Sequence, residues 1–495
     1  MRTSGILLPI SSLPTKYGIG GFSKEAYEFV DRLKAAGQKN WQILPLGPTG
    51  YGDSPYQSVS TFAGNPYFIS LDTLMEESLL TEEECQAADC GDDPNSVNYE
   101  RVYHTRYIVL EKAFQRFAER KENEDALYLR FLAENNDWLE NFCLYAAIKE
   151  KLQGLSWQEW PEDLRNREAR ALENMKEELA AEMDFIRFLQ FEFWKQWHEL
   201  KVYANDKGIR IIGDVPIYVA MDSADTWANP EMFQFDEDGK PTGVAGCPPD
   251  AFAVTGQLWG NPLYDWSYHK NTGYQWWIRR MSHCFYLYDI VRVDHFRGFD
   301  EYYNIPYGDP TAEFGHWEKG PGIDLFDALK AHFGEMNIIA EDLGFVTDSV
   351  RDLVKNVGLP GMKVVEFGFG YEPEYEYLPH YYTQNSIAYT GTHDNETFAG
   401  WWNNQSQIRK DFLQKYMGDQ GADDDQTRWD FIRMTMSTVS DTVIIPMQDY
   451  LGLGNEARIN EPSTLGNNWK WRMKEDAFTP ELIERIRDFT KTYDR

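Results

Sequence analysis

Acidic side chains close or follow three short apolar runs of this sequence. Asp294 and Glu341 are the last residues of the runs 290–294 and 337–341, and Asp394 lies shortly after the run 386–390. Two carboxyl groups that flank a glycosidic bond can cleave it with retention: one attacks the anomeric carbon, and the other protonates the leaving oxygen. A third can grip the ring hydroxyls and favour ring distortion. These acids therefore indicate glycoside chemistry, provided that the fold brings them together.

The neighbours of two of these acids suggest different roles for them. Arg292 precedes Asp294 by two residues, so along a strand both side chains point to the same face. A guanidinium there would keep Asp294 ionised and oriented, as a nucleophile requires. Glu341 follows an apolar run, which favours a raised pKa and the role of proton donor. We expect the two carboxyl groups to lie about 5–5.5 Å apart, as in retaining enzymes.

Other interpretations of these segments remain open. Any one acid at a strand end can cap the next helix or form a structural salt bridge. A metal site could be built from Asp294, His295, His393 and Asp394. However, neighbouring residues on a strand point to opposite faces, which disfavours shared ligation. We therefore expect no metal ligands here, and three acids at strand ends favour a catalytic site over three unrelated caps.

The elements that must position these acids form a recurring pattern. Each run is β-rich and almost continuously apolar, as in strands that are buried on both faces. The eight runs span residues 5–9, 40–45, 210–215, 290–294, 337–341, 362–366, 386–390 and 442–446. Eight parallel strands with intervening helices predict an α/β fold, a (β/α)8 TIM barrel, whose active site lies at the carboxyl ends of the strands. An open doubly wound sheet is the alternative, although its glycine-rich phosphate turn is absent after the first run.

The spacing of the runs predicts one catalytic domain, residues 1–495, with two insertions. Residues 71–182 are rich in Glu, Ala, Leu, Arg and Lys with helical periodicity, which predicts a mostly helical subdomain. We expect it to cover the active-site face, with Tyr103 as a remote ligand contact or simply a packing residue. Residues 220–277 are rich in Gly, Pro, Asp and Trp, which is typical of a loop-rich insertion near the active site. Only about 50 residues follow the last run, so no C-terminal β-sandwich is expected.

Composition excludes several classes of partner. The formal net charge is −32, and such a surface repels phosphate backbones and anionic lipid. No apolar run reaches 18 residues, so no membrane span is expected. The apolar stretch near the N-terminus is short and broken by Pro9, which favours a first strand over a signal peptide. The five cysteines fit no disulfide framework or zinc site, and this favours reduced thiols in a cytoplasmic protein.

Four segments resemble signature regions of the α-amylase clan. They are residues 292–298 (RVDHFRG), 340–344 (AEDLG), 392–395 (THDN) and 213–219 (GDVPIYV). In most α-amylases the last region continues to an Asn-His pair, which is absent here. Further segments resemble amylomaltases, the 4-α-glucanotransferase family of this clan. They are residues 5–14, 50–57, 246–250 and 257–262, and the resemblance extends over about residues 4–472.

The resemblance implies a role for each matching residue. Asp294 would be the nucleophile, Glu341 the acid/base and Asp394 the stabiliser of the transition state. The substrate-binding residues that it implies are Ser54, Tyr56, Asp214, Arg292, His295, His393, Tyr51, Pro249, Asp250, Gln257 and Trp259. The turns around Tyr51 and Asp250 are also ordinary turn chemistry, and Trp259 alone is compatible with packing.

The three acids do not decide between transfer and hydrolysis. Attack on the glycosyl-enzyme by water gives hydrolysis, whereas attack by a sugar hydroxyl gives transfer. An insertion with the rigid pair Pro248-Pro249 could bind an acceptor sugar and keep water out. The resemblance implies a 4-α-glucanotransferase that needs no cofactor, with an α-1,4-glucan donor and a glucose or maltooligosaccharide acceptor. An α-amylase-type hydrolase remains the alternative. A non-catalytic glucan-binding protein also remains possible, although it would not need all three acids.

Overall fold

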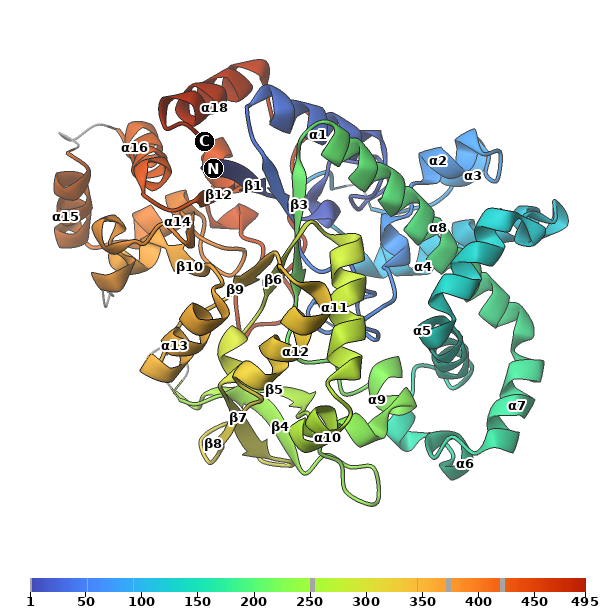
Figure 1. Cartoon of the computed structure of the whole chain (residues 1–495). Coiled ribbons are helices and arrows are strands. Elements are labelled where there is room, and N and C mark those ends of the chain that lie inside the picture. Colours follow the sequence, from blue (N-terminus) through green and yellow to red (C-terminus); the bar gives the residue numbers. More distant parts are fainter. Residues whose placement is uncertain are drawn as a thin grey trace.

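The core of the molecule is a closed barrel of eight parallel strands (Figure 1). The computed structural model describes residues 2–50, 52–91, 93–249, 254–344, 346–370, 375–418 and 423–495. Around the barrel the strand order is β1-β12-β11-β10-β9-β6-β3-β2. The strands are β1 (Thr3–Leu7), β2 (Asn40–Gln42), β3 (Arg210–Val215), β6 (Ile290–Val293), β9 (Ile338–Ala340), β10 (Gly361–Val364), β11 (Ser386–Tyr389) and β12 (Thr442–Pro446). The predicted (β/α)8 barrel is confirmed, and each predicted run overlaps one strand.

Burial on both faces explains why these runs are apolar. Every residue of β1, β2 and β11 is buried. Helices shield the outside of the ring, so outward-facing side chains need to be as apolar as inward-facing ones. The helices along the rest of the chain are α1 (Lys24–Ala35), α11 (Gln275–Leu287), α12 (Ile323–Phe333), α13 (Asp348–Val357), α14 (Phe398–Asn404), α15 (Gln407–Met417), α16 (Asp424–Ser437), α17 (Met447–Leu451) and α18 (Pro480–Thr492).

The long connection between β2 and β3 is helical. Its helices are α2 (Leu71–Glu76), α3 (Glu82–Gln86), α4 (Tyr99–Glu119), α5 (Ala126–Lys151), α6 (Glu162–Arg165), α7 (Ala169–Glu178) and α8 (Ala180–Asp206). Aromatic side chains join them, with the rings of Phe117 and Phe188 5.0 Å apart. Tyr99 donates a hydrogen bond of 2.9 Å to the carbonyl of Trp469, which links α4 to the segment after the last strand. Tyr103 is 50% exposed on α4, and its contact with a ligand stays a prediction.

A second, antiparallel sheet lies beside the barrel in the order β5-β4-β7-β8. It comprises β4 (Gly243–Cys247), β5 (Gln257–Pro262), β7 (Glu301–Pro306) and β8 (His316–Lys319), and it follows the short helix α9 (Ala224–Ala228). The composition of residues 220–277 indicated loop, because glycines interrupt the alternation that marks a strand. The structure explains one of them: a Cβ at Gly246 would lie 2.1 Å from the carbonyl oxygen of Gln257 on the neighbouring strand. The helix α10 (Trp266–Asn271) completes this region.

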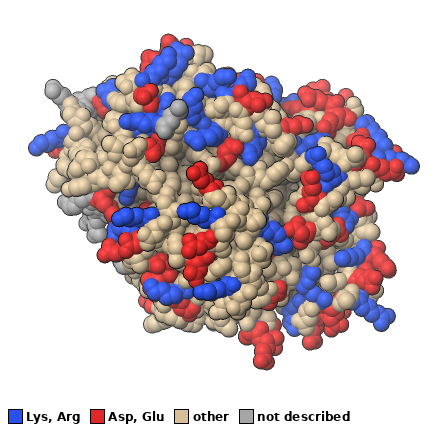
Figure 2. All heavy atoms as spheres, viewed as in Figure 1, with Lys and Arg blue, Asp and Glu red and all other residues tan. Residues whose placement is uncertain are grey.

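The surface carries both signs of charge. Figure 2 shows acidic and basic side chains interspersed over the visible face. In the part of the chain that the structure describes, none of the helices is long and apolar enough to cross a membrane. Cys85, Cys90, Cys143 and Cys284 are buried as thiols.

Candidate active site

Strand register brings the acidic residues to one end of the barrel. Asp214 on β3 is the register partner of Arg292 on β6. One step further along, the N–H of Asp294 donates to Val215 at 2.9 Å, and the N–H of Glu341 donates to Val293 at 3.1 Å. The ends of three neighbouring strands therefore carry these acids side by side, at the edge where active sites of this fold are built.

Arg292 is the electrostatic centre of the site. Its side chain is 3% exposed, and its Nη1 donates to both carboxylate oxygens of Asp214 at 2.7 Å. Its Nη2 lies 3.1 Å from Oδ1 of Asp294. One guanidinium thus bridges two carboxylates, and the Arg292–Asp294 contact expected from their spacing is present. Because the fork holds Asp214 and Asp294 at fixed positions, it orients them as well as balancing their charge.

Asp294 and Glu341 titrate as a pair. Burial raises the pKa of Asp294, the Arg292 guanidinium opposes this, and repulsion from Glu341 raises it further. Burial also raises the pKa of Glu341, again opposed by Arg292. Two interacting buried carboxyl groups of this kind retain a shared proton at higher pH than an exposed acid would. One ionised and one protonated carboxyl group is the combination that retaining glycoside chemistry needs.

Main-chain donors hold the carboxyl group of Glu341. His295 donates its N–H to Oε2 at 2.7 Å, and Leu343 donates its N–H to Oε1 at 3.1 Å. His295 has a positive φ of 50°, a conformation that costs a residue with a side chain some free energy and that accompanies this hydrogen bond. Both donors favour the ionised form of Glu341. These two contacts therefore oppose the effect of burial on the pKa of Glu341.

Asp342, the next residue, has a structural role. Its Oδ1 accepts the N–H of Met362 at 2.7 Å and so links β9 to β10. The structural interpretation that was open for acids at strand ends fits Asp342, and the catalytic role of Glu341 stays a prediction.

Tyr56 connects the two sides of the site. Its hydroxyl lies 2.8 Å from Oδ2 of Asp214 and 2.9 Å from Nε2 of His393. Asp214 is bound to Arg292 as a carboxylate and only accepts, so the tyrosine proton goes to it. The hydroxyl oxygen then accepts from His393, which places a proton on Nε2 of that ring. Burial lowers the pKa of His393, which fits a neutral ring stacked on Tyr56 with centroids 5.3 Å apart.

Asp394 is positioned by residues far along the chain. Asn460 donates its side-chain amide to Oδ1 of Asp394 at 2.6 Å, and Arg458 donates to the main-chain carbonyl of Asp394 at 2.8 Å. His393 Nε2 lies 3.4 Å from the same Oδ1. The carboxylate is partly exposed, with 41% of its side chain accessible, so it can still reach a ligand.

Of the remaining predicted site residues, some lie at the rim of the site and two lie outside the described residues. The ring of Trp259 meets His295 edge-on at 4.8 Å, and its Nε1 donates to Gln257 at 3.1 Å. Ser54 accepts the N–H of Tyr56 at 3.3 Å, and Pro249 is exposed. Tyr51 and Asp250 lie outside the described residues. Within the described ranges, His, Cys, Asp and Glu side chains form no group of three that could hold a metal ion.

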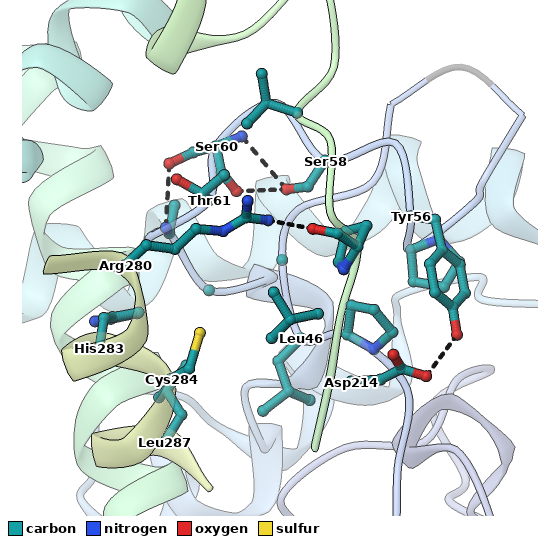
Figure 3. A pocket seen from close by; sticks show the side chains of 18 of the residues that line it. Leu46, Tyr56, Ser58, Ser60, Thr61, Asp214, Arg280, His283, Cys284 and Leu287 are labelled. Carbon is teal, nitrogen blue, oxygen red and sulfur yellow. Dashed lines mark hydrogen bonds between the residues drawn. The ribbon is translucent and has the colours of Figure 1, made fainter. Parts of the chain in front are cut away.

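A small cavity of about 50 Å³ lies behind the Asp214 end of β3. Figure 3 shows it between Asp214 and Tyr56 on one side and Arg280, His283 and Cys284 of α11 on the other. The guanidinium of Arg280 donates to the carbonyls of Pro216 and Ile217, which fixes the chain just after β3. A volume of this size has room for a few water molecules, so water can solvate this side of the site without opening it.

Comparisons with known proteins agree with this geometry. A family model described as 4-alpha-glucanotransferase matches residues 8–478. The 4-alpha-glucanotransferase of Streptococcus pneumoniae is 50% identical over 100% of this chain and 97% of its own length. The enzyme of the same name from Thermus thermophilus is 44% identical over 100% and 99%. The chain belongs to the 4-alpha-glucanotransferase family. Its reaction is glucan transglycosylation, and the hydrolase alternative is not favoured.

Solved structures support the same assignment. An amylomaltase from Streptococcus agalactiae, in complex with acarbose, superposes with a TM-score of 0.97 at 42% identity and covers 100% of both chains. An amylomaltase from Corynebacterium glutamicum shares the fold, with a TM-score of 0.78 at 18% identity. It covers 99% of this chain and 75% of its own. The first structure places this transglycosylase among the amylomaltases over its whole length.

Sequence analysis missed several residues that complete the site of this 4-alpha-glucanotransferase family member. Asn460 and Arg458 hold Asp394, and Trp469 packs against Tyr56 with ring centroids 5.7 Å apart. All three lie beyond β12, where no periodicity or strand end marks them. A Trp and two polar residues in a loop are too common to single out, so only the folded structure identifies them.

Removing the hydroxyl of Tyr56 tests the network across the site. Tyr56→Phe keeps the ring stacked on His393 but removes one of the donors to Oδ2 of Asp214, which then relies on Nη1 of Arg292. We expect kcat/KM to fall about 10- to 100-fold, since a hydrogen bond to a charged group is worth about 1.5–3 kcal/mol. Tyr203→Phe is the matched control, because that hydroxyl donates to a carboxylate, Asp31, on the outside of the barrel. Equal values of kcat/KM for the two variants would show that the Tyr56 hydroxyl has no role in the site.

Proposed function

We propose that this glucanotransferase acts by double displacement with Asp294 as nucleophile, Glu341 as acid/base and Asp394 as stabiliser of the transition state. The observation that carries the proposal is the bridge from Arg292 to Asp214 and Asp294. It favours an ionised Asp294 beside a second buried carboxyl group. That asymmetry is the requirement for a retaining reaction.

In the first half-reaction an oxygen of Asp294 bonds to the anomeric carbon as the bond to the leaving oxygen breaks. Glu341 gives its proton to that oxygen, so the shortened glucan departs as an alcohol. The acid must first turn from the main-chain donors of His295 and Leu343 towards the ligand. In the second half-reaction Glu341 takes the proton of an acceptor hydroxyl, and the acceptor oxygen displaces Asp294.

The substrate that fits this site is an α-1,4-glucan. We propose that Ser54, Tyr56, Asp214, Arg292 and His393 bind the glucose ring at the cleavage point. Support comes from the shared hydrogen bonds of Tyr56, Asp214 and His393 and from the acarbose complex of the Streptococcus agalactiae relative. Asp394 would hold ring hydroxyls from the partly exposed end of its carboxylate.

The acceptor side is formed by rim residues in this proposal. Trp259 and His295 form an edge-to-face pair, the N–H of His295 binds Glu341, and Gln257 fixes the indole of Trp259. Tyr51, Pro249 and Asp250 would guide the glucan. A glucose or maltooligosaccharide would be the acceptor. The location proposed is the cytoplasm, which the buried thiols of Cys85, Cys90, Cys143 and Cys284 fit.

Incubation with maltotriose tests the balance between transfer and hydrolysis. We expect a ladder of longer maltooligosaccharides together with glucose, because the glycosyl-enzyme is passed to a sugar hydroxyl rather than to water. Chromatography of the products over time gives the readout. Glucose and maltose alone would indicate a hydrolase, and no change would contradict the proposal that this site is catalytic.

A further inference from the structure

Glu366 is a buried acid for which the mechanism above has no role. It follows β10 directly, in the 3-10 helix Val365–Gly368, and is 2% exposed. Its Oε1 is buried and has no hydrogen-bond partner among the described residues. No described Lys, Arg or His forms an ion pair with it either. A buried charge without such a partner is costly, so the position of this carboxyl group needs an explanation.

The carboxyl group of Glu366 supports the turn that presents His393 and Asp394. Gly391 lies directly against it, because a Cβ built on that glycine would lie 3.3 Å from both oxygens. The N–H of Glu366 also donates to the carbonyl of Thr390 at 3.3 Å. The turn is closed by Asn395, whose side chain accepts the N–H of Thr392 at 2.8 Å. A rigid turn thus rests on the side chain of Glu366.

The charges around Glu366 disfavour its ionisation. Asp449 of α17 accepts from the hydroxyl of Thr390 at 2.5 Å, and Glu396 accepts from the side-chain amide of Asn455 at 2.6 Å. Arg458 acts in the opposite direction, but its guanidinium is engaged with main-chain carbonyls of Asp394 and Asn460.

These surroundings raise the pKa values of both buried acids, Glu366 and Asp449. Burial, and then repulsion from Asp449 and Glu396, raises the pKa of Glu366 well above its ordinary value. Burial likewise raises the pKa of Asp449 to about 6. Desolvation and like charges act in the same direction here.

We propose that Glu366 is a positioning residue that acts as an uncharged acid. By supporting Gly391, it determines where the turn holds His393 and Asp394 relative to the barrel. The inference rests on the proposed role of Asp394 for its effect on catalysis. The uncharged state is independent of that role. A neutral carboxyl group can fill this space where an ionised one would attract water into it.

Two substitutions separate shape from charge. Glu366→Gln keeps the size and the neutral state, so we expect kcat within about twofold of the parent. Glu366→Ala removes the support, and a displacement of the turn by about 1 Å should lower kcat about 10- to 100-fold with little change in KM. Circular dichroism confirms folding of each variant. Equal losses in both variants, with native folding, would overturn the proposal.

Thermal unfolding between pH 4 and pH 8 tests the charge state without any assay of activity. In the unfolded chain Glu366 ionises near its ordinary pKa, whereas in the folded chain it stays protonated. The parent therefore loses stability as the pH rises above that value. Glu366→Gln cannot titrate there. The difference in Tm, variant minus parent, should therefore grow with pH by about 1–2 °C per pH unit above pH 5.

Glu182→Gln serves as the control, since that acid lies exposed near the start of α8 and is not among the charges that act on Glu366. We expect no such growth for it. A difference for Glu366→Gln that stays flat or falls with pH would show an ionised Glu366 and would overturn the proposal. An inactive Asp394 variant would leave this result unchanged, so the two ideas fail separately.

Discussion

Mixed with an α-glucosyl fluoride, Glu341→Gln should accumulate a glycosyl-enzyme and Asp294→Asn should not. Fluoride departs with little protonation, so the first half-reaction survives without the acid. The adduct then persists, because no general base activates the acceptor. Asp294→Asn has no nucleophile, and its activity should fall by about 10,000-fold on any donor. Intact-protein mass spectrometry shows which variant gains the glycosyl mass.

The pattern of adducts decides the assignment. An adduct on Asp294→Asn and none on Glu341→Gln would mean that the two roles are exchanged. No adduct on either, in folded protein, would leave the covalent mechanism without support. Asp342→Asn is the control for substituting an acid at this strand end, since its carboxylate binds the N–H of Met362 and is proposed to have no part in the chemistry.

Arg292→Gln should cost both activity and stability. The change leaves the buried carboxylate of Asp214 and the partly exposed one of Asp294 without their cation, and the loss of a buried partner typically destabilises a protein by about 3–5 kcal/mol. It also raises the pKa of Asp294, so less of the nucleophile is ionised, and kcat/KM should fall at least about 100-fold. Chemical denaturation and steady-state kinetics measure the two effects. Arg292→Lys keeps the charge but cannot span both carboxylates, and it should recover stability better than rate.

A matched control for this arginine lies in the helical connection between β2 and β3. Arg187 of α8 pairs with Glu140 of α5 through two hydrogen bonds of 2.8 Å. Arg187→Gln removes a fork of the same kind far from the barrel mouth, so stability should fall while kcat stays near that of the parent. Full activity in Arg292→Gln would show that the bridge is only structural.

The barrel and its acids were predictable because both are encoded locally. Eight runs of buried strand stand out in the sequence, and the spacing of Arg292 and Asp294 alone predicts their contact. The small sheet was not predictable, because glycines such as Gly246 break its pattern and only the pairing of distant strands explains them. Asn460 was equally hidden, and Glu366, although it is the last residue of the run 362–366, gave no sign of its contact with Gly391. Each acts on the turn that carries Asp394 through contacts between residues that are remote in sequence, which no local pattern records.

The contacts of Tyr56 have a consequence for how the molecule matures. The Tyr56 hydroxyl contacts Asp214 and His393, which lie 158 and 337 residues further along the chain. Such contacts form late, because large loops must close first. A newly synthesised or partly unfolded chain can contain most of its helices and all of its acidic residues while it still lacks an assembled active site. We therefore expect transfer activity to appear only after the barrel has closed.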